Sequence, residues 1–104
     1  SQISTLLGAA QRFGKRNGDK TGISVQALTD RGLVPEDWAD GTAINPWAGD
    51  VTIAVDTDVT QVVVKFTGID DDAAGLRFQD ELTNGIAESA TYTSGTLSAT
   101  FEAG

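Results

Sequence analysis

The feature that most constrains the fold is a strict alternation of apolar with small or polar residues, which follows a proline-containing turn. In INPWAGDVTIAVD, one face of an extended chain receives Val51, Ile53 and Val55. A period of two residues is typical of a half-buried strand in an antiparallel sheet. The segment QVVVKFTGI repeats this period, and ESATYTSGTLSATFE shows it around Ser94-Gly95. The sequence therefore predicts an antiparallel sheet of about four or more strands.

Two other segments have the period of a helix. In the first, the apolar residues at helical spacing are Ile3, Leu6, Leu7, Ala10 and Phe13. They predict a helix over about residues 1–16, and its abrupt start indicates the tail of a longer helix. The second, IDDDAAGLRFQDELTNG, has acidic residues at its N-terminal end and a stripe of Ala74, Phe78 and Leu82. Because Gly75 inside it costs about 1 kcal/mol relative to Ala, we expect another group to pack closely there.

Residues 21–44 are a predicted linker of short helical pieces. Ser24 is a suitable N-cap, Gly32 ends the first piece, and Pro35 opens a second piece that holds Trp38. The order of elements predicts a single α+β domain over residues 1–104. In this fold the N-terminal helix and the linker pack on the antiparallel sheet, and the second helix is inserted within the sheet segment of about residues 51–102.

Residues 45–50 form a predicted turn in front of the first strand. Pro46 fixes its own φ and pushes Asn45 toward extended geometry, while Gly49 can adopt a left-handed conformation. Large aromatic residues in small domains usually supply buried area. We therefore predict that Trp47 is mostly buried as a core residue beside the first strand, and that Pro46, Trp47 and Gly49 have structural roles. The alternative for Trp47 is stacking against a ligand.

The composition excludes several functional classes. The 104 residues include neither His nor Cys, which excludes Ser-His-Asp and Cys-His catalysis, disulfides and thiolate metal sites. The net charge of −8 argues against nucleic acids and anionic membranes as partners, since phosphate binding needs a basic surface. We therefore expect a protein that is not an enzyme, holds no cofactor and binds no nucleic acid.

Two carboxylate clusters are the remaining candidates for chemistry. Asp56 and Asp58 lie in a predicted hairpin turn, and Asp70, Asp71 and Asp72 precede the second helix. Paired carboxylates can hydrolyse glycosides or hold a hard cation, but turns and helix N-termini also favour acidic residues. Turn and capping roles are the preferred interpretation, and no metal site is predicted.

Charge is distributed unevenly along the chain. Residues 1–35 hold five cations against two acids, a net of +3, whereas residues 36–104 hold two cations against thirteen acids, a net of −11. This polarity is either an ordinary solvated surface or a means of orienting copies of the molecule with the basic end toward the acidic end.

Three stretches together resemble a known family. The succession GLVPEDW, INPWAGDVTIAVD and VVVKFTGIDDDAAGLRFQDEL is similar to the globular domain of type IVb pilins, over about residues 21–83. The resemblance implies a pilin fold and a structural subunit of a pilus that serves adhesion, conjugation or motility. It also implies a hydrophobic N-terminal helix outside this sequence, an inner-membrane anchor before assembly and an extracellular pilus afterwards. The sequence departs from the family at Ala74, where the family usually has the first Cys of a disulfide.

The resemblance implies that the partners are copies of the same chain, with a host or recipient cell surface as a further candidate. We predict that basic residues near the first helix face acidic residues on a neighbouring subunit. The basic candidates are Arg12, Lys15, Arg16 and Lys20, and the acidic candidates are Asp70, Asp71, Asp72, Asp80 and Glu81. Without the polymerising helix, the isolated domain is expected to be a monomer.

Two other functions stay open. A minor pilin or a pseudopilin of a secretion system would share the fold, and calcium binding at the acidic turns would distinguish it. A carbohydrate-binding adhesive module would use Trp38, Trp47 or Tyr92 as an exposed stacking platform.

Overall fold

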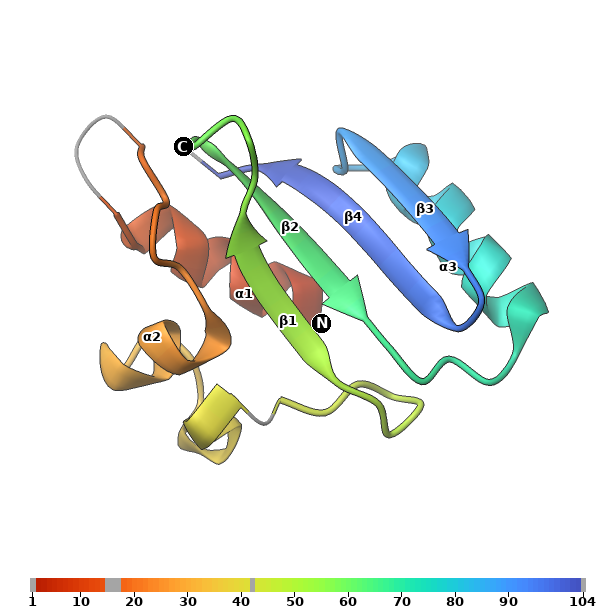
Figure 1. Cartoon of the computed structure of the whole chain (residues 1–104), viewed down its shortest axis with the longest axis horizontal. Helices are drawn as coiled ribbons and strands as arrows, with labels where there is room; N and C mark the ends of the chain where they lie inside the picture. The colour runs from red at the N-terminus through yellow and green to blue at the C-terminus, as the bar shows by residue number, and fades with distance from the viewer. Residues whose placement is uncertain (1, 15–17, 42, 104) are drawn as a thin grey trace.

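The computed structural model describes residues 2–14, 18–41 and 43–103, which form an antiparallel sheet with helices beside it (Figure 1). The elements in chain order are α1 (Gln2–Arg12), α2 (Val25–Asp30), the 3-10 helix η1 (Glu36–Gly41), β1 (Val51–Val55), β2 (Gln61–Phe66), α3 (Asp72–Thr83), β3 (Ser89–Thr93) and β4 (Thr96–Glu102). The sheet has four strands in the order β1-β2-β4-β3, and all neighbouring pairs are antiparallel. The predicted α+β class and the helix inserted between strands are confirmed.

The alternation in the sequence determines which face of the sheet is buried. Ile53 pairs with Val64, and Val64 pairs with Ala99, so the apolar side chains of three strands lie on one face. The buried residues of the two central strands are Val62, Val64, Phe66, Leu97, Ala99 and Phe101. Full burial of a Val, Leu or Phe side chain stabilises a fold by about 1.5–3 kcal/mol, so this face supplies much of the core.

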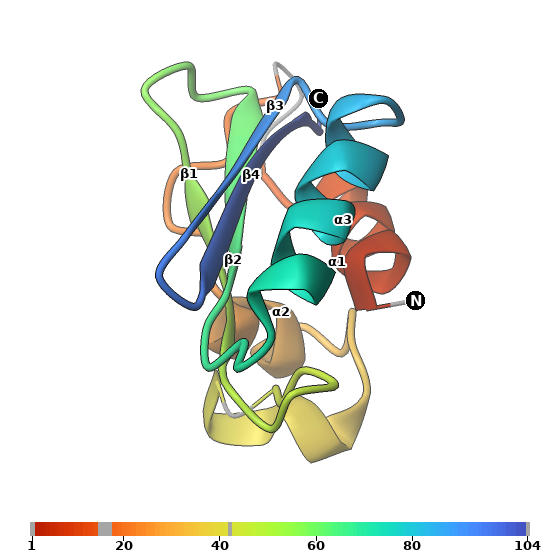
Figure 2. The ribbon, with the colours of Figure 1, turned by 90° about the vertical axis from the view of Figure 1, so that its right-hand side faces the viewer.

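Helices α1 and α3 cover this apolar face, and Figure 2 shows both on the same side of the sheet. The buried residues of α1 are Ile3, Leu6, Ala9 and Ala10. The helix ends at Arg12, so the prediction that it continues to about residue 16 is wrong. Gly14 explains the early end, because its φ of 99° is incompatible with a right-handed helix. Residues 15–17 lie outside the described part of the chain.

The linker forms helical pieces at the β1 side of the sheet (Figure 1). The side chain of Ser24 caps α2 by accepting a hydrogen bond from the backbone N–H of Ala27 at 3.0 Å. Gly32 has a φ of 68° just after the helix ends. Leu28 of α2 is fully buried. The predicted cap and stop of this linker helix are therefore confirmed.

Helix α3 also has the caps and close packing that its sequence predicts. The side chain of Asp71 accepts a hydrogen bond from the backbone N–H of Ala74 at 3.2 Å, and Asn84 is the C-cap. A Cβ at Gly75 would lie 2.3 to 2.5 Å from ring carbons of Tyr92. The expectation that another group packs closely against Gly75 is confirmed, and that group is the tyrosine ring of β3.

A two-residue turn joins β3 to β4. Ser94 and Gly95 have φ values of 47° and 86°, and two successive positive values are typical of a type I′ turn. Thr93 and Thr96 face each other at the start of the ladder. The turn that was predicted at Ser94-Gly95 is therefore confirmed, and it fixes the register of the last two strands.

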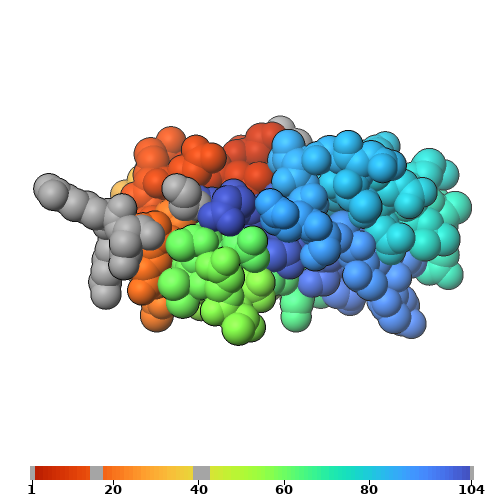
Figure 3. Space-filling model, turned by 90° about the horizontal axis from the view of Figure 1, so that it is seen from above, coloured from red at the N-terminus to blue at the C-terminus, as the bar shows by residue number. Residues whose placement is uncertain are grey.

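The molecule is elongated, with principal extents of 39 × 27 × 19 Å. Figure 3 shows the red residues of α1 and the light-blue residues near the end of α3 on one side, and the green β1–β2 turn on the other. Within residues 2–14, 18–41 and 43–103, no helix has the length and apolar character needed to cross a membrane.

Candidate functional site

The turn in front of β1 is organised by Asn45, whose side chain is only 4% exposed. Its Oδ1 accepts hydrogen bonds from the backbone N–H groups of Trp47 at 2.8 Å and Gly49 at 3.0 Å. Its Nδ2 donates to the backbone carbonyls of Asp50 at 3.1 Å and Thr67 at 2.7 Å. Both ends of the amide are satisfied, as a buried polar group requires. Sequence reasoning assigned no role to Asn45, although an Asn that precedes Pro is a recognised turn signal.

Gly49 is needed because two backbone segments approach closely. A Cβ at residue 49 would lie 1.9 Å from the carbonyl oxygen of Thr67. The left-handed conformation that was expected at Gly49 belongs instead to Ala48, which has a φ of 63°. Pro46, which follows Asn45 in the turn, is exposed. Asn45 and Gly49 together therefore fasten the turn to the chain that leaves β2.

Trp47 is partly buried and packs against the hydrophobic core, which agrees with the structural role expected for it. Its ring centroid lies 6.0 Å from that of Phe78, and the Phe78 ring lies 5.2 Å from that of Phe66 in an edge-to-face arrangement. The three rings connect the turn, α3 and β2. Trp47 therefore links the turn to α3.

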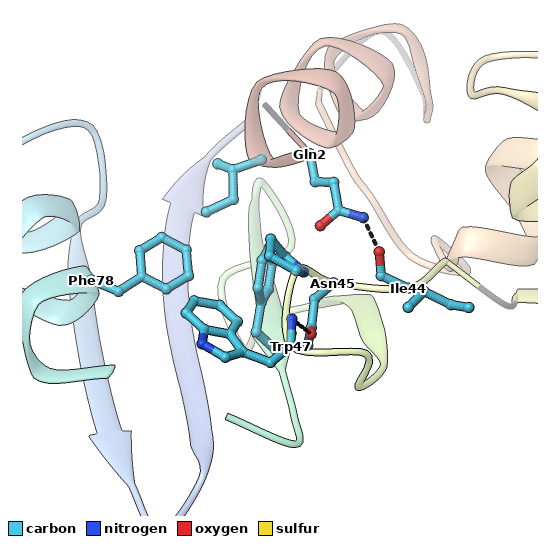
Figure 4. Close-up of a pocket in the computed structure, with 8 residues that line it drawn as sticks. Gln2, Ile44, Asn45, Trp47 and Phe78 are labelled. Carbon is cyan, nitrogen blue, oxygen red and sulfur yellow. Dashed lines mark hydrogen bonds between the residues drawn. The ribbon is translucent and has the colours of Figure 1, made fainter. Parts of the chain in front are cut away.

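The space beside Trp47 is an apolar cavity of about 470 Å³ (Figure 4). Its walls come from the start of α1, the turn, β2 and α3, and they consist of Gln2, Ile3, Ile44, Asn45, Pro46, Trp47, Phe66 and Phe78. The Nε2 of Gln2 donates to the carbonyl of Ile44 across one wall. The volume is within the range of small-molecule sites. The described residues of its walls carry no charged or nucleophilic side chain, so these walls can accommodate an apolar group.

Of the predicted basic interface residues, Arg12 is exposed at the C-terminal end of α1. Its Nη2 donates to the carbonyl of Leu33 at 3.3 Å, which leaves the rest of the guanidinium on the surface. Lys15 and Arg16 lie outside the described residues.

Lys20 is not a surface residue, which corrects its predicted place at a subunit interface. Its side chain is 2% exposed, and its Nζ donates to the carbonyl of Phe13 at 2.8 Å. Burial lowers the pKa of Lys20, while the nearby charge of Glu102 acts in the opposite direction. Its backbone N–H donates to the carbonyl of Val59 at 2.7 Å. Lys20 therefore holds the segment after α1 against the β1–β2 turn, and its ammonium is not available to a neighbouring subunit.

The five acidic candidates are exposed and lie at or within α3. Two of them also act inside the domain, since Asp71 caps α3 and the Oδ1 of Asp72 accepts a hydrogen bond from the Tyr92 hydroxyl at 2.5 Å. This hydrogen bond, together with burial, raises the pKa of Tyr92. Asp70, Asp80 and Glu81 have exposed side chains. Figure 1 shows α3 at one end of the long axis, while α1 runs toward the other end.

The other carboxylate cluster forms a turn. The Oδ1 of Asp58 accepts hydrogen bonds from the hydroxyl and the backbone N–H of Thr60, at 2.8 and 3.0 Å. These two bonds lower the pKa of Asp58. Among the residues that the structure describes, no three potential metal-ligating side chains come together.

The aromatic residues that a carbohydrate-binding module would need do not form a common platform. Trp38 belongs to η1, Trp47 to the turn before β1, and Tyr92 to β3, and each is partly buried. The Tyr92 ring packs against Gly75, and the Trp47 ring packs against Phe78. These contacts inside the domain cover part of the surface of two of the three rings.

Comparisons with models of protein families, with curated proteins and with solved structures find no match to this chain.

Proposed function

We propose that this domain is a structural subunit of a type IV pilus-like filament. The observation that carries the proposal is the arrangement of the segments whose sequence resembles type IVb pilins. The linker is fastened to the sheet by the Asn45 turn, and α1 and α3 lie on the same face of an antiparallel sheet. This arrangement agrees with the fold that the resemblance implies. The lack of His and Cys in the sequence also favours a role in assembly over a role in catalysis.

In such a filament the partners are other copies of the chain, and the location is the outside of a bacterial cell. Exposed ion pairs contribute only about 0–1 kcal/mol each, so the charged ends of the domain would set orientation and register, and they would not supply cohesion. The exposed basic end of α1 and the acidic α3 lie toward opposite ends of the long axis, which suits subunits that are stacked in one direction.

Immunogold labelling tests the proposal directly. Antibodies raised against the domain would be applied to intact cells that express the full-length protein, and a strain with the gene disrupted would serve as the control. We expect label along extracellular filaments, and we expect both label and filaments to disappear in the disrupted strain. Label restricted to the cell envelope, with unchanged filaments in the disrupted strain, would contradict the role as a main filament subunit and favour the pseudopilin alternative.

A further inference from the structure

Within the part of the chain that the structure describes, no other strand pairs with the outer edge of β3. β3 is the last strand in the sheet order, and Figure 2 looks onto this edge, with α3 beside it and no element in front of it. Thr93 and Thr96 flank a two-residue turn and therefore form a hydrogen-bonded pair. Alternation along the ladder then directs the backbone N–H and C=O groups of Ala90 and Tyr92 away from β4. Such an edge is a template for an additional strand.

One donor on this edge is occupied by a side chain. The backbone N–H of Tyr92 donates to the Oε1 of Gln79 at 2.7 Å. Asp72 and Gly75 contact the hydroxyl and the ring of the same tyrosine. Helix α3 therefore runs along β3, and Gln79 satisfies an edge N–H that a strand would otherwise pair. Unlike a backbone bond, this bond can be exchanged for another by a rotation of the glutamine side chain.

The flank of α3 beside this edge is apolar at its centre. Leu76 is four residues after Asp72 and three before Gln79, so it lies on the same side of the helix as these two residues. Leu76 is 49% exposed, and Ile86, just beyond the helix, is 64% exposed. In a strand added beside β3, every second side chain would point to the helix side of the sheet and would meet this apolar flank.

The charge of the surface around the β3 edge determines which kind of added strand it favours. Residues 70–93 contain six acidic residues and one cation, a net of −5. A second copy that paired through its own β3 would bring two acidic helices together, and like charges would oppose the contact. A basic segment would be attracted to the same surface.

We propose that the β3 edge accepts an extended basic peptide with apolar residues at alternate positions. The peptide adds a strand to the sheet, and one of its carbonyls replaces Gln79 as the acceptor for the Tyr92 N–H. Backbone hydrogen bonds supply the affinity, and the contacts of alternate side chains with Leu76 supply the selectivity. The argument for this binding site does not use the proposed filament role, and the site can be tested in the 104-residue chain.

NMR titration of the isotope-labelled chain tests the proposal. The probe is acetyl-KVKVTVK-amide, and its charge-reversed counterpart is acetyl-EVEVTVE-amide. We expect the largest shifts at the amides of Ala90 and Tyr92, and an affinity for the basic peptide at least about 10-fold higher than for the acidic one. Gln79→Ala should raise the affinity for the basic peptide by about 2- to 10-fold, because it removes the competing acceptor. Gln11→Ala, at an exposed position of α1, is the matched control and should leave the affinity unchanged.

Two further variants distinguish strand addition from unspecific attraction. Ala90→Pro removes an N–H that points away from β4, so it should abolish binding while the β3–β4 ladder is kept. Leu76→Lys, at an exposed helix position, should weaken binding without loss of the fold. Equal affinity for the two peptides, shifts centred away from β3, or no effect of Gln79→Ala would overturn the proposal. So would dimerisation of the Gln79→Ala chain in the absence of peptide, because the edge would then prefer a second copy.

Discussion

Two buried polar residues, Asn45 and Lys20, hold irregular segments against the sheet. Asn45 makes four hydrogen bonds to the backbone of the turn and of the chain after β2. Lys20 donates to the end of α1 and packs beside the β1–β2 turn. The polar groups of both side chains have hydrogen-bond partners in the folded chain. Removing either side chain therefore leaves buried polar atoms of its partners unsatisfied, and this lowers the free energy of unfolding by more than the loss of a hydrogen bond on the surface would.

Asn45→Ala should lower the free energy of unfolding by about 2–4 kcal/mol, because two carbonyls and two N–H groups lose their partner at once. Gln11→Ala is the control, since the Gln11 side chain is exposed on α1, and it should change stability by about 0.5 kcal/mol or less. Urea denaturation measures both. A loss below 1 kcal/mol for Asn45→Ala would show that the turn is held by its other contacts.

Lys20→Glu should destabilise the domain by about 3 kcal/mol or more, because it places an acid near the carbonyl of Phe13 and near Glu102. Arg12→Glu reverses the same charge at an exposed position and should cost about 1 kcal/mol or less. Thermal denaturation gives the melting temperatures of the two variants for this comparison. Equal melting temperatures would mean that the Lys20 ammonium reaches water.

Neither role could be predicted from the sequence, and the reason is distance along the chain. Thr67, which accepts a hydrogen bond from Asn45, is 22 residues away, and no local pattern marks it. Lys20 has the appearance of a solvated charge in a polar segment, and only the packing of that segment onto the β1–β2 turn buries it.

At the scale of elements, three residues of α3 contact the same residue of β3, Tyr92. Its ring packs on Gly75, its hydroxyl donates to Asp72, and its N–H donates to Gln79. These three helix positions are spaced so that they lie on one side of α3. The helix is therefore positioned at the edge of the sheet by polar and steric contacts, in addition to the apolar packing of Phe78 and Leu82.

Gly75→Ala should destabilise the domain by about 1–3 kcal/mol, although Ala is the better helix former, because its Cβ would overlap the Tyr92 ring. In a Tyr92→Ala background the same change should instead stabilise by about 1 kcal/mol. Gly8→Ala in α1 is the control, since a Cβ there meets nothing within 4 Å. A double-mutant cycle by chemical denaturation checks these signs, and additive effects would contradict the clash.

The hydroxyl contact predicts a specific dependence on pH. Because the pKa of Tyr92 is raised from 10.0 in the folded state, its stabilising effect is complete below about pH 10 and is lost as the pH rises through the folded value. Lys20 acts in the opposite direction, since a pKa lowered from 10.5 makes stability rise with pH in the same region.

Comparison with Tyr92→Phe isolates the tyrosine contribution, because Phe keeps the ring and lacks the hydroxyl. Melting temperatures measured from about pH 8 to pH 12 should fall more steeply for the original chain than for Tyr92→Phe. Parallel profiles for the two proteins would show that the hydrogen bond to Asp72 does not contribute to stability.

The strands were predictable because their signal is local. The alternation of apolar and polar residues predicts which faces of β2 and β4 are buried, and the turn residues Ser94 and Gly95 predict the β3–β4 hairpin. The end of α1 was less predictable, because its apolar spacing continues to Phe13 while Gly14 already has a left-handed φ. The partly buried state of Trp47 follows from the cavity between α1 and α3, which is a property of how distant segments meet.

At the scale of the whole molecule, the exposed end of α1 and the acidic helix α3 lie far apart. The exposed cation Arg12 ends α1, and the acidic α3 occupies the other end of the long axis (Figure 1). If copies stack in a filament, this polarity would bring unlike charges together at each junction.

Reversal of the charges at Arg12, Lys15 and Arg16 in the full-length protein should reduce the number of filaments per cell, because the orientation of neighbouring subunits is then disfavoured. The 104-residue chain with the same changes should remain a monomer by sedimentation and melt within a few degrees of the original. Reversal of Asp80 and Glu81 in the same protein should restore part of the filament number. Unchanged filament counts after the first reversal would show that the polarity has no role in assembly.

The position of Tyr92 also gives the molecule a built-in optical reporter. Tyr92 is the single tyrosine in the sequence, which contains two tryptophans, and it lies where α3 meets the sheet edge. Near-ultraviolet absorbance of the phenol therefore senses this one contact, whereas tryptophan emission senses η1 and the turn before β1. Release of α3 from β3 can thus be followed separately from unfolding of the rest of the domain, without any label.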